Sequence, residues 1–221
     1  MRHFTKAICV VDTCSIINLD EIVLAKHDVL YYVRYFFDVR VCSAITEEFE
    51  RHRDLVRSRE VSYWRSFLNS RRYVPSVLTD DCTTLGPFYT SAPSFNGLRH
   101  AGEHGNARVA LELLVTCKAG QTIFVSDDKE ASNAFLESMR CSFPGVHLWT
   151  SIDVVLYLGA ILLKQKKTSF ESIREAIRAV YAASARKWGT DEAGKSAIMR
   201  SQRNSVDSLK RLKKVIDQWR D

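Results

Sequence analysis

The sequence predicts an α/β fold built on a central parallel sheet. Short runs of consecutive apolar residues, rich in β-branched side chains, recur along the chain and are typical of strands buried on both faces. Segments with helical spacing of apolar residues separate these runs. Because parallel neighbours need crossover connections, this alternation implies helices on both faces of the sheet.

The first half of the chain yields two strands and several helical segments. We expect a strand over residues 7–11, ending at Asp12, and a second short strand over residues 39–42. Residues 15–19 and 21–30 have mixed helical character, whereas the aromatic-rich residues 31–37 give no clear assignment. A long charged helix is expected from residue 43 to about residue 70. Pro and Gly then punctuate a long loop over residues 73–101.

The second half continues the alternation and ends in a basic helical tail. Strands are expected over residues 122–125 and 146–149. Ser151 is the expected N-cap of an apolar helix that ends at residue 163. Further helices are expected over residues 103–117, 128–139, 169–188 and 196–219, the last two forming a hairpin. We therefore expect an α/β domain over residues 1–163 and a helical extension over residues 164–221.

Several protein classes are excluded by composition. The six cysteines form no Cys-x-x-Cys pair and no Cys/His cluster at zinc spacing, so neither a disulfide framework nor a zinc module is expected. The apolar run before Asp12 is too short for a signal peptide. The longest apolar stretch, about ten residues, is half of what a bilayer crossing needs. We expect a cytoplasmic protein with no membrane partner.

Positive charge is concentrated in the tail. The formal net charge is +6, and residues 164–221 hold 15 Lys and Arg against 7 Asp and Glu. Such a segment suits an anionic partner, because Lys and Arg supply most non-specific affinity for nucleic acid. A solvated helix surface, a protein partner and a second subunit explain the same pattern. The apolar stripes of these helices indicate only that something covers them.

Acidic residues gather where the predicted strands end and helices begin. In an open parallel sheet the ligand site lies beyond the carboxyl ends of the strands. Each acid alone could simply cap a helix or complement its dipole. Together they predict a cluster that needs a cation, and oxygen-only ligands favour Mg²⁺ or Mn²⁺. The members are Asp12, Glu47 or Glu48, Glu103, and Asp127 or Asp128.

Four stretches resemble the motifs of PIN-domain nucleases, the family of VapC-like toxins and related bacterial and archaeal PIN proteins. Val10-Val-Asp-Thr-Cys-Ser resembles the opening strand and its aspartate, with Cys14 in a place often held by Asn or Ser. Ser43-Ala-Ile-Thr-Glu-Glu-Phe49 is similar to the second motif, and Glu48 fits it best. Gly102-Glu-His-Gly-Asn106 and Ile123-Phe-Val-Ser-Asp-Asp128 resemble the third and fourth. The resemblance covers residues 7–163.

The resemblance implies a three-layer PIN-like fold and a ribonuclease that uses one or two Mg²⁺ or Mn²⁺ ions. Asp12, Glu48, Glu103 and Asp128 are the implied catalytic and metal-binding residues, with Asp127 as a further ligand. Thr13, Ser15 and Glu47 would support these ligands by hydrogen bonds. Substrate RNA would contact residues near the same edge: Arg99, His100, Arg108 and Lys129.

The sequence leaves several alternatives open for the biological role. Many bacterial PIN proteins are toxins held by an antitoxin, so an antitoxin or another protein could bind the C-terminal helices, and the chain could form a homodimer. The main rivals are a DNA-directed PIN-like nuclease of a defence system and a PIN-like domain that binds RNA or protein without catalysis. RNA is the expected substrate and DNA the less favoured one.

Overall fold

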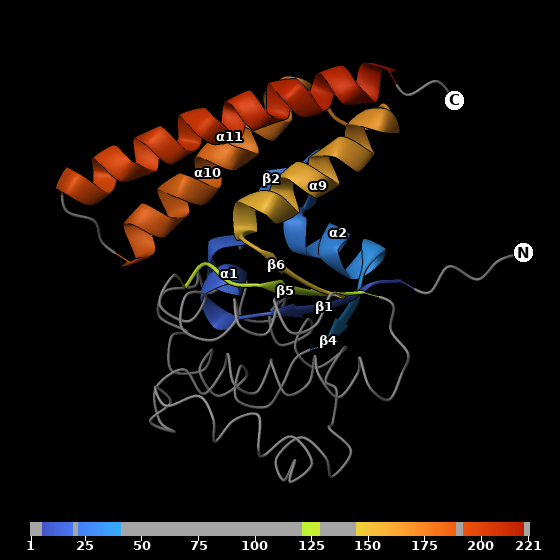
Figure 1. Cartoon of the computed structure of the whole chain (residues 1–221), viewed down its shortest axis with the longest axis horizontal. Coiled ribbons are helices and arrows are strands. Elements are labelled where there is room, and N and C mark those ends of the chain that lie inside the picture. The colour runs from blue at the N-terminus through green and yellow to red at the C-terminus, as the bar shows by residue number, and fades with distance from the viewer. Residues whose placement is uncertain (1–5, 20–21, 41–120, 129–144, 189–191, 219–221) are drawn as a thin grey trace, which may run out of the picture. The chain divides into compact units, whose positions relative to one another are not determined.

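The computed structural model describes residues 6–19, 22–40, 121–128, 145–188 and 192–218 (Figure 1). The chain divides into two compact units. The first combines Met1–Ile17 with Arg34–Trp149, and the second combines Asn18–Val33 with Thr150–Asp221. The expected division into residues 1–163 and 164–221 stays a prediction.

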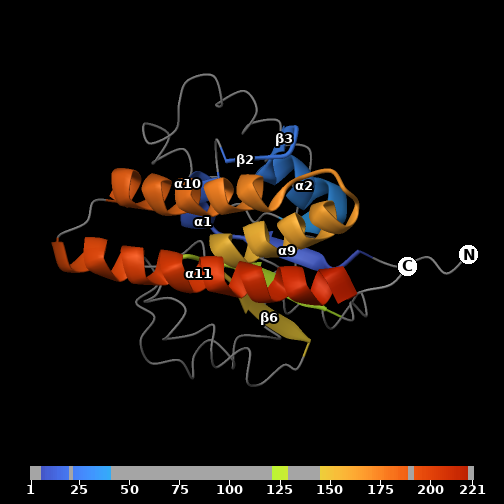
Figure 2. The same cartoon turned by 90° about the horizontal axis from the view of Figure 1, so that it is seen from above.

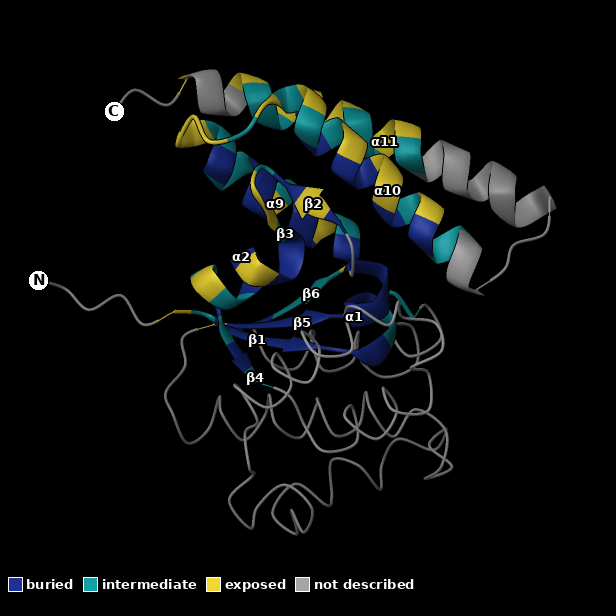
Figure 3. Ribbon diagram, turned by 180° about the vertical axis from the view of Figure 1, so that it is seen from behind, coloured by how far each residue is buried: buried dark blue, intermediate teal, exposed yellow. Residues whose placement is uncertain are grey.

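The first unit contains a four-stranded sheet in which every neighbouring pair is parallel, in the order β4-β1-β5-β6. This confirms the α/β class and the four expected strand positions, although β4 is described only as far as Arg40. Every residue of β1 and β5 is buried (Figure 3), as continuous apolar runs require. The strands are β1 (Ile8–Val11), β4 (Asp38–Arg40), β5 (Thr122–Val125) and β6 (Val146–Trp149).

Helix α1 (Thr13–Leu19) follows β1 after a single residue, Asp12. A helix was expected here from residue 15, and the structure begins it two residues earlier. The backbone carbonyl of Asp12 accepts a hydrogen bond of 3.0 Å from the amide of Ile16, which forms the first helical turn. The chain thus turns from strand to helix at Asp12.

The second unit contains a small antiparallel hairpin, in which β2 (Val23–Leu24) pairs with β3 (His27–Asp28). The helical interpretation of residues 21–30 was therefore wrong for residues 23–28, whereas Val29 and Leu30 are helical. The two-residue turn is possible because Ala25 adopts a left-handed conformation, with φ of 60°. Helix α2 (Val29–Phe36) follows at once, and all but its first two residues belong to the stretch that the sequence left unassigned.

The described part of the second unit also contains three helices that contact one another: α9 (Ser151–Lys164), α10 (Phe170–Trp188) and α11 (Glu192–Gln218). Figures 1 and 2 both show α10 and α11 side by side, as expected for a hairpin. The second hairpin helix begins at residue 192 rather than 196. Close packing of α9 on α10 is achieved at Gly159, where an added Cβ would lie 2.9 Å from Cγ2 of Ile173.

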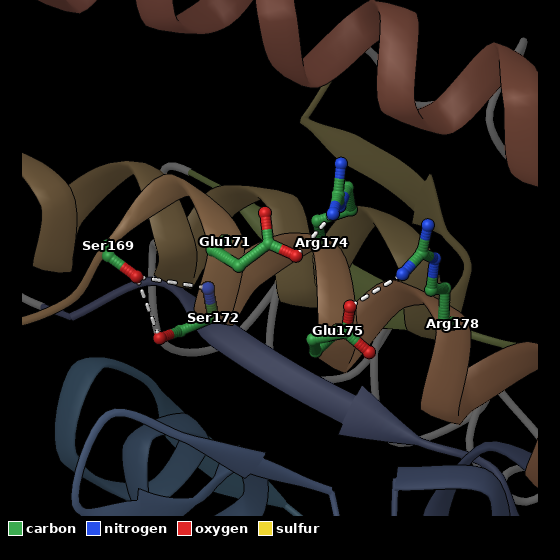
Figure 4. Close-up of polar contacts among 6 residues, drawn as sticks. All are labelled: Ser169, Glu171, Ser172, Arg174, Glu175 and Arg178. Carbon is green, nitrogen blue, oxygen red and sulfur yellow. Dashed lines mark hydrogen bonds and ion pairs between the residues drawn. The ribbon is translucent and has the colours of Figure 1, made fainter.

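Helices α9 and α10 begin at hydroxyl caps. Thr150, not Ser151, is the N-cap of α9, and it forms a reciprocal capping box with Asp153. At α10 the hydroxyl of Ser169 accepts a hydrogen bond of 3.1 Å from the amide of Ser172 (Figure 4). Two ion pairs along the same exposed face, Glu171 with Arg174 and Glu175 with Arg178, add a few tenths of a kcal/mol each, on the order of other such surface pairs.

No helix within the described residues combines the length and the apolar character that crossing a membrane would require.

Candidate active site

The register of the sheet brings two chain segments to the same edge. Val11, the last residue of β1, pairs with Val125, the last residue of β5. The amide of Asp12 donates a hydrogen bond of 3.0 Å to the carbonyl of Val125, so Asp12 continues the ladder by one residue. Asp12 and the segment that follows β5 therefore begin at neighbouring positions, at the carboxyl ends of two central strands.

The side chain of Asp12 is buried, with 1% of its surface exposed. Its Oδ1 accepts a hydrogen bond of 2.7 Å from the amide of Ser15, the contact of an N-cap residue with the third residue of its helix. The sequence predicted this capping role as the structural alternative to metal binding.

The thiol of Cys14 interacts with both Asp12 and Asp127. Its Sγ is 3.3 Å from Oδ1 and 3.2 Å from Oδ2 of Asp12. Burial raises the pKa of this thiol well above its usual value, and the negative charges of Asp12 and Asp127 and the hydrogen bond to Asp12 raise it further. A backbone hydrogen bond with Asp127 acts in the opposite direction. Cys14 is therefore a neutral S–H donor at neutral pH, close to Asp12 and Asp127.

The segment after β5 is held by its own short contacts. Ser126 is buried, and its amide donates a hydrogen bond of 2.9 Å to the carbonyl of Trp149 at the end of β6. The hydroxyl of Ser126 accepts a hydrogen bond of 3.1 Å from the amide of Asp128. Asp127 and Asp128 are half-buried. Ser126 thus fixes the turn that carries both aspartates.

The structure brings together part of the predicted site. Asp12 and Asp127 both act on the same thiol, and Asp128 is adjacent to Asp127 in the chain. Thr13 and Ser15 are buried in the first turn of α1, and Ser15 contacts Asp12 through its backbone amide. Within the described ranges no group of three or more His, Cys, Asp or Glu side chains is arranged to hold a metal ion.

The other predicted residues lie outside the described part of the chain. They are the three predicted glutamates and all four predicted substrate contacts: Glu47, Glu48, Glu103, Arg99, His100, Arg108 and Lys129.

Sequence reasoning did not assign a role to Cys14 or Ser126. Both are small residues next to predicted acids, and that adjacency is the only signal the sequence offers. The contacts of Cys14 with Asp12 and of Ser126 with Asp128 span two residues, whereas the interaction of Cys14 with Asp127 depends on the pairing of β1 with β5. The pattern of either segment alone does not contain that information.

No protein-family model, no curated protein and no solved structure matches this chain. The chemistry of the site is therefore argued from the contacts described above.

Proposed function

We propose that this chain is a metal-dependent endoribonuclease with a PIN-like, three-layer α/β domain over residues 1–163. The observation that carries the proposal is the placement of Asp12 and Asp127 beside one thiol, at the carboxyl ends of two adjacent parallel strands. An open α/β sheet binds its ligands at this edge. The full acidic set would be Asp12, Glu48, Glu103 and Asp128, with Asp127 as an additional ligand.

The described side chains suit a hard divalent cation. Asp12 and Asp127 offer carboxylate oxygens, which Mg²⁺ and Mn²⁺ prefer. The S–H group of Cys14 donates to Asp12 and helps to fix the orientation of that carboxylate.

A bound Mg²⁺ or Mn²⁺ would supply Lewis-acid activation of water and neutralise charge on the phosphodiester. The chain's own residues would supply position. Asp12 is fixed by the Ser15 amide and the Cys14 thiol, and the turn carrying Asp127 and Asp128 is fixed by Ser126. Two carboxylates held at a rigid sheet edge supply the preorganisation that hydrolysis needs.

The capping contact of Asp12 favours a second candidate, a PIN-like domain that binds RNA or protein without catalysis. In that case the hydrogen bond from Ser15 would be the whole role of Asp12. Its near-complete burial argues against this, because an N-cap does not need to be buried to function. A DNA-directed nuclease would use the same acids and differ in substrate.

The decisive experiment is a cleavage assay with labelled single-stranded RNA and DNA in Mg²⁺, Mn²⁺ or EDTA. We expect RNA to be cut in either metal and left intact in EDTA. Asp12→Asn should lower the rate by more than about a hundredfold, because removal of a direct ligand costs more than removal of a supporting residue. Metal-independent cleavage would contradict the proposal, and preferential cleavage of DNA would identify the rival nuclease.

Asp28→Asn provides a matched control. Asp28 precedes α2 as Asp12 precedes α1, and its Oδ1 accepts a hydrogen bond of the same length, 2.7 Å, from the amide of Tyr31. The variant makes the same chemical change at a helix cap outside the acidic set. It should retain full cleavage, whereas equal losses in both variants would indicate an effect on folding.

The proposed biological context is that of a toxin whose antitoxin blocks RNA cleavage. If the cleavage assay succeeds, expression of the active chain should arrest growth, and Asp12→Asn should relieve the arrest. Growth arrest that persists in the inactive variant would separate toxicity from nuclease activity.

A further inference from the structure

An apolar groove lies in the second unit, between α9 and α11. Its volume is about 270 Å³, and its walls are almost wholly apolar. Sites for drug-sized molecules span roughly 300–1,000 Å³, so this groove suits one or two side chains better than a metabolite. Tyr157, with 41% of its surface exposed, lies at the groove. The lining residues are Tyr157, Ala160, Ile161, Lys164, Gln165 and Leu212.

The two segments that border the groove carry an excess of positive charge, although Asp207 and Asp217 stand directly outside the second one and Asp207 also acts on Arg211. Neither residues 154–170, around the end of α9, nor residues 208–216, around Leu212, contain an aspartate or glutamate. Lys210 is partly neutralised by its ion pair of 2.9 Å with Asp207. These segments contain seven cations, and all of them are exposed except Lys213, which is half-buried. They are Lys164, Lys166, Lys167, Lys210, Arg211, Lys213 and Lys214.

One of these lysines stands in a backbone position that favours glycine. Lys166 has φ of 56°, and its amide bonds to the carbonyl of Leu163 while that of Lys167 bonds to Leu162. This is the Schellman arrangement at a helix end, in which the left-handed residue is usually glycine. A lysine here strains the backbone, and it adds a charge beside the groove.

We propose that this groove docks an acidic, amphipathic helix of a partner protein. Two apolar side chains, four residues apart on the partner, would fill the groove, and flanking carboxylates would face the lysines. The proposal is independent of the nuclease activity. It requires only the apolar groove and the excess of positive charge beside it.

Two other occupants suit the groove less well. RNA would satisfy the lysines through its phosphates, but it has no aliphatic side chain to fill an apolar groove. A second copy of the chain would bring the same positively charged segments together, and the chain as a whole carries a net charge of +6. Like charges placed in contact oppose association.

The test uses the full chain and a dye-labelled helical peptide rich in Glu, with two Leu residues at four-residue spacing. A peptide of the same composition with the Leu spacing disrupted is the specificity control. We expect fluorescence anisotropy to show binding of the first peptide with a dissociation constant below about 100 µM, and at least about tenfold weaker binding of the second. No binding of the first peptide, or equal binding of both, would overturn the proposal.

Three variants locate the site. Ala160→Glu places a carboxylate in the groove, and the double variant Lys164→Glu with Lys167→Glu reverses the charge at two positions beside it. Each should weaken peptide binding by at least about tenfold, whereas Lys26→Glu, in the β2–β3 hairpin, should not. Thermal unfolding checks that each variant is folded. Binding that survives both groove variants would overturn the proposal.

Lys166→Gly separates a docking role from a structural one. Glycine relieves the left-handed strain, so the melting temperature should rise while peptide affinity falls. An unchanged affinity would remove Lys166 from the docking surface. Single-stranded RNA is titrated in parallel: RNA binding weakened by the same groove variants would assign the surface to RNA, and a concentration-dependent dimer lost in Ala160→Glu would assign it to self-association.

Discussion

Asp12 performs a structural task whatever its chemistry. The hydrogen bond from Ser15 makes it the N-cap of α1, and the S–H group of Cys14 contacts both of its oxygens. A cap needs a side-chain acceptor and not a negative charge. A metal ligand at this position needs the charge as well. The two tasks can therefore be separated by substitution.

We predict that Asp12→Asn and Asp12→Ala differ in stability but not in activity. Asparagine caps helices about as well as aspartate, whereas alanine in place of a cap costs roughly 1 kcal/mol. Urea unfolding should show Asp12→Asn close to the wild type and Asp12→Ala clearly less stable, and both should lack metal-dependent cleavage. Equal destabilisation by both substitutions would show that the charge itself holds the fold.

A second prediction at this scale concerns Cys9, a buried thiol in β1 whose pKa is raised by burial from 9.0 to about 12. Below pH 9 the thiol is protonated in both the folded and the unfolded chain, so its contribution to stability is constant. Between pH 9 and pH 12 only the unfolded chain loses the proton. The free energy of unfolding should then fall by up to about 1.4 kcal/mol per pH unit.

Cys9→Ala tests this linkage, because it removes the thiol while Cys14 and all other groups remain. Urea unfolding of both proteins between about pH 8 and pH 10.5 should show the wild type losing its advantage over the variant as the pH rises. A constant difference in unfolding free energy across that range would contradict the raised pKa.

The sequence predicted the acids of the site better than the residues that hold them. Asp12 and Asp127 follow buried strands, and the ends of such strands are readable from continuous apolar runs. Cys14 and Ser126 have roles only because β1 pairs with β5 and because Asp128 folds back on Ser126. The interaction of Cys14 with Asp127 is tertiary, and a local pattern does not encode it, whereas the contacts of Cys14 with Asp12 and of Ser126 with Asp128 span only two residues.

Among the elements, β1, β5 and β6 were predictable and the β2–β3 hairpin was not. A two-residue hairpin turn can usually be recognised in a sequence by Asn-Gly or a similar pair. Here the turn is Ala25-Lys26, and Ala25 takes the left-handed conformation without that signal. Each strand is also only two residues long, too short to show alternation. The expected helix was the natural interpretation of apolar residues with no turn signal.

Helix α2 was missed for a related reason. Its sequence, Val-Leu-Tyr-Tyr-Val-Arg-Tyr-Phe, is rich in aromatic and β-branched residues, which have low helix propensity. Burial overrides that propensity: Val29, Leu30, Tyr32 and Val33 are buried, whereas Tyr31 and Tyr35 are exposed. This is the amphipathic spacing of a surface helix.

The packing of α9 on α10 leads to a prediction that opposes helix propensity. Gly159→Ala in a helix interior ordinarily stabilises by about 0.5–1 kcal/mol. Here the new Cβ would meet Cγ2 of Ile173 at 2.9 Å and its Cδ1 at 3.0 Å. We expect a net loss of roughly 1–3 kcal/mol in unfolding free energy, because overpacking outweighs propensity.

A double-mutant cycle supplies the control. In the Ile173→Ala background the crowding atoms are gone, so Gly159→Ala should become neutral or stabilising when measured by urea unfolding. The same loss in both backgrounds would place the cause outside the contact between α9 and α10.

At the scale of the whole molecule, metal binding should be visible as stability. A ligand that binds only the folded chain adds about 2.7 kcal/mol at one hundred times its dissociation constant, which for a chain of this size raises the melting temperature by roughly 5–10 °C. We expect Mn²⁺ to raise the melting temperature of the wild type and of Asp28→Asn, and to have little effect on Asp12→Asn. Equal shifts in all three would place the ion elsewhere.

The order of strands in the sheet affects how the chain folds during its synthesis. β1 lies between β4 and β5, and Ile8 pairs with Thr122. A ribosome adds about 5–20 residues per second, so β5 emerges on the order of ten seconds after β1. One edge of β1 can pair early with β4, but the other stays open throughout that interval. Nascent chains should therefore be vulnerable to aggregation and dependent on chaperones until the middle of the protein has been translated.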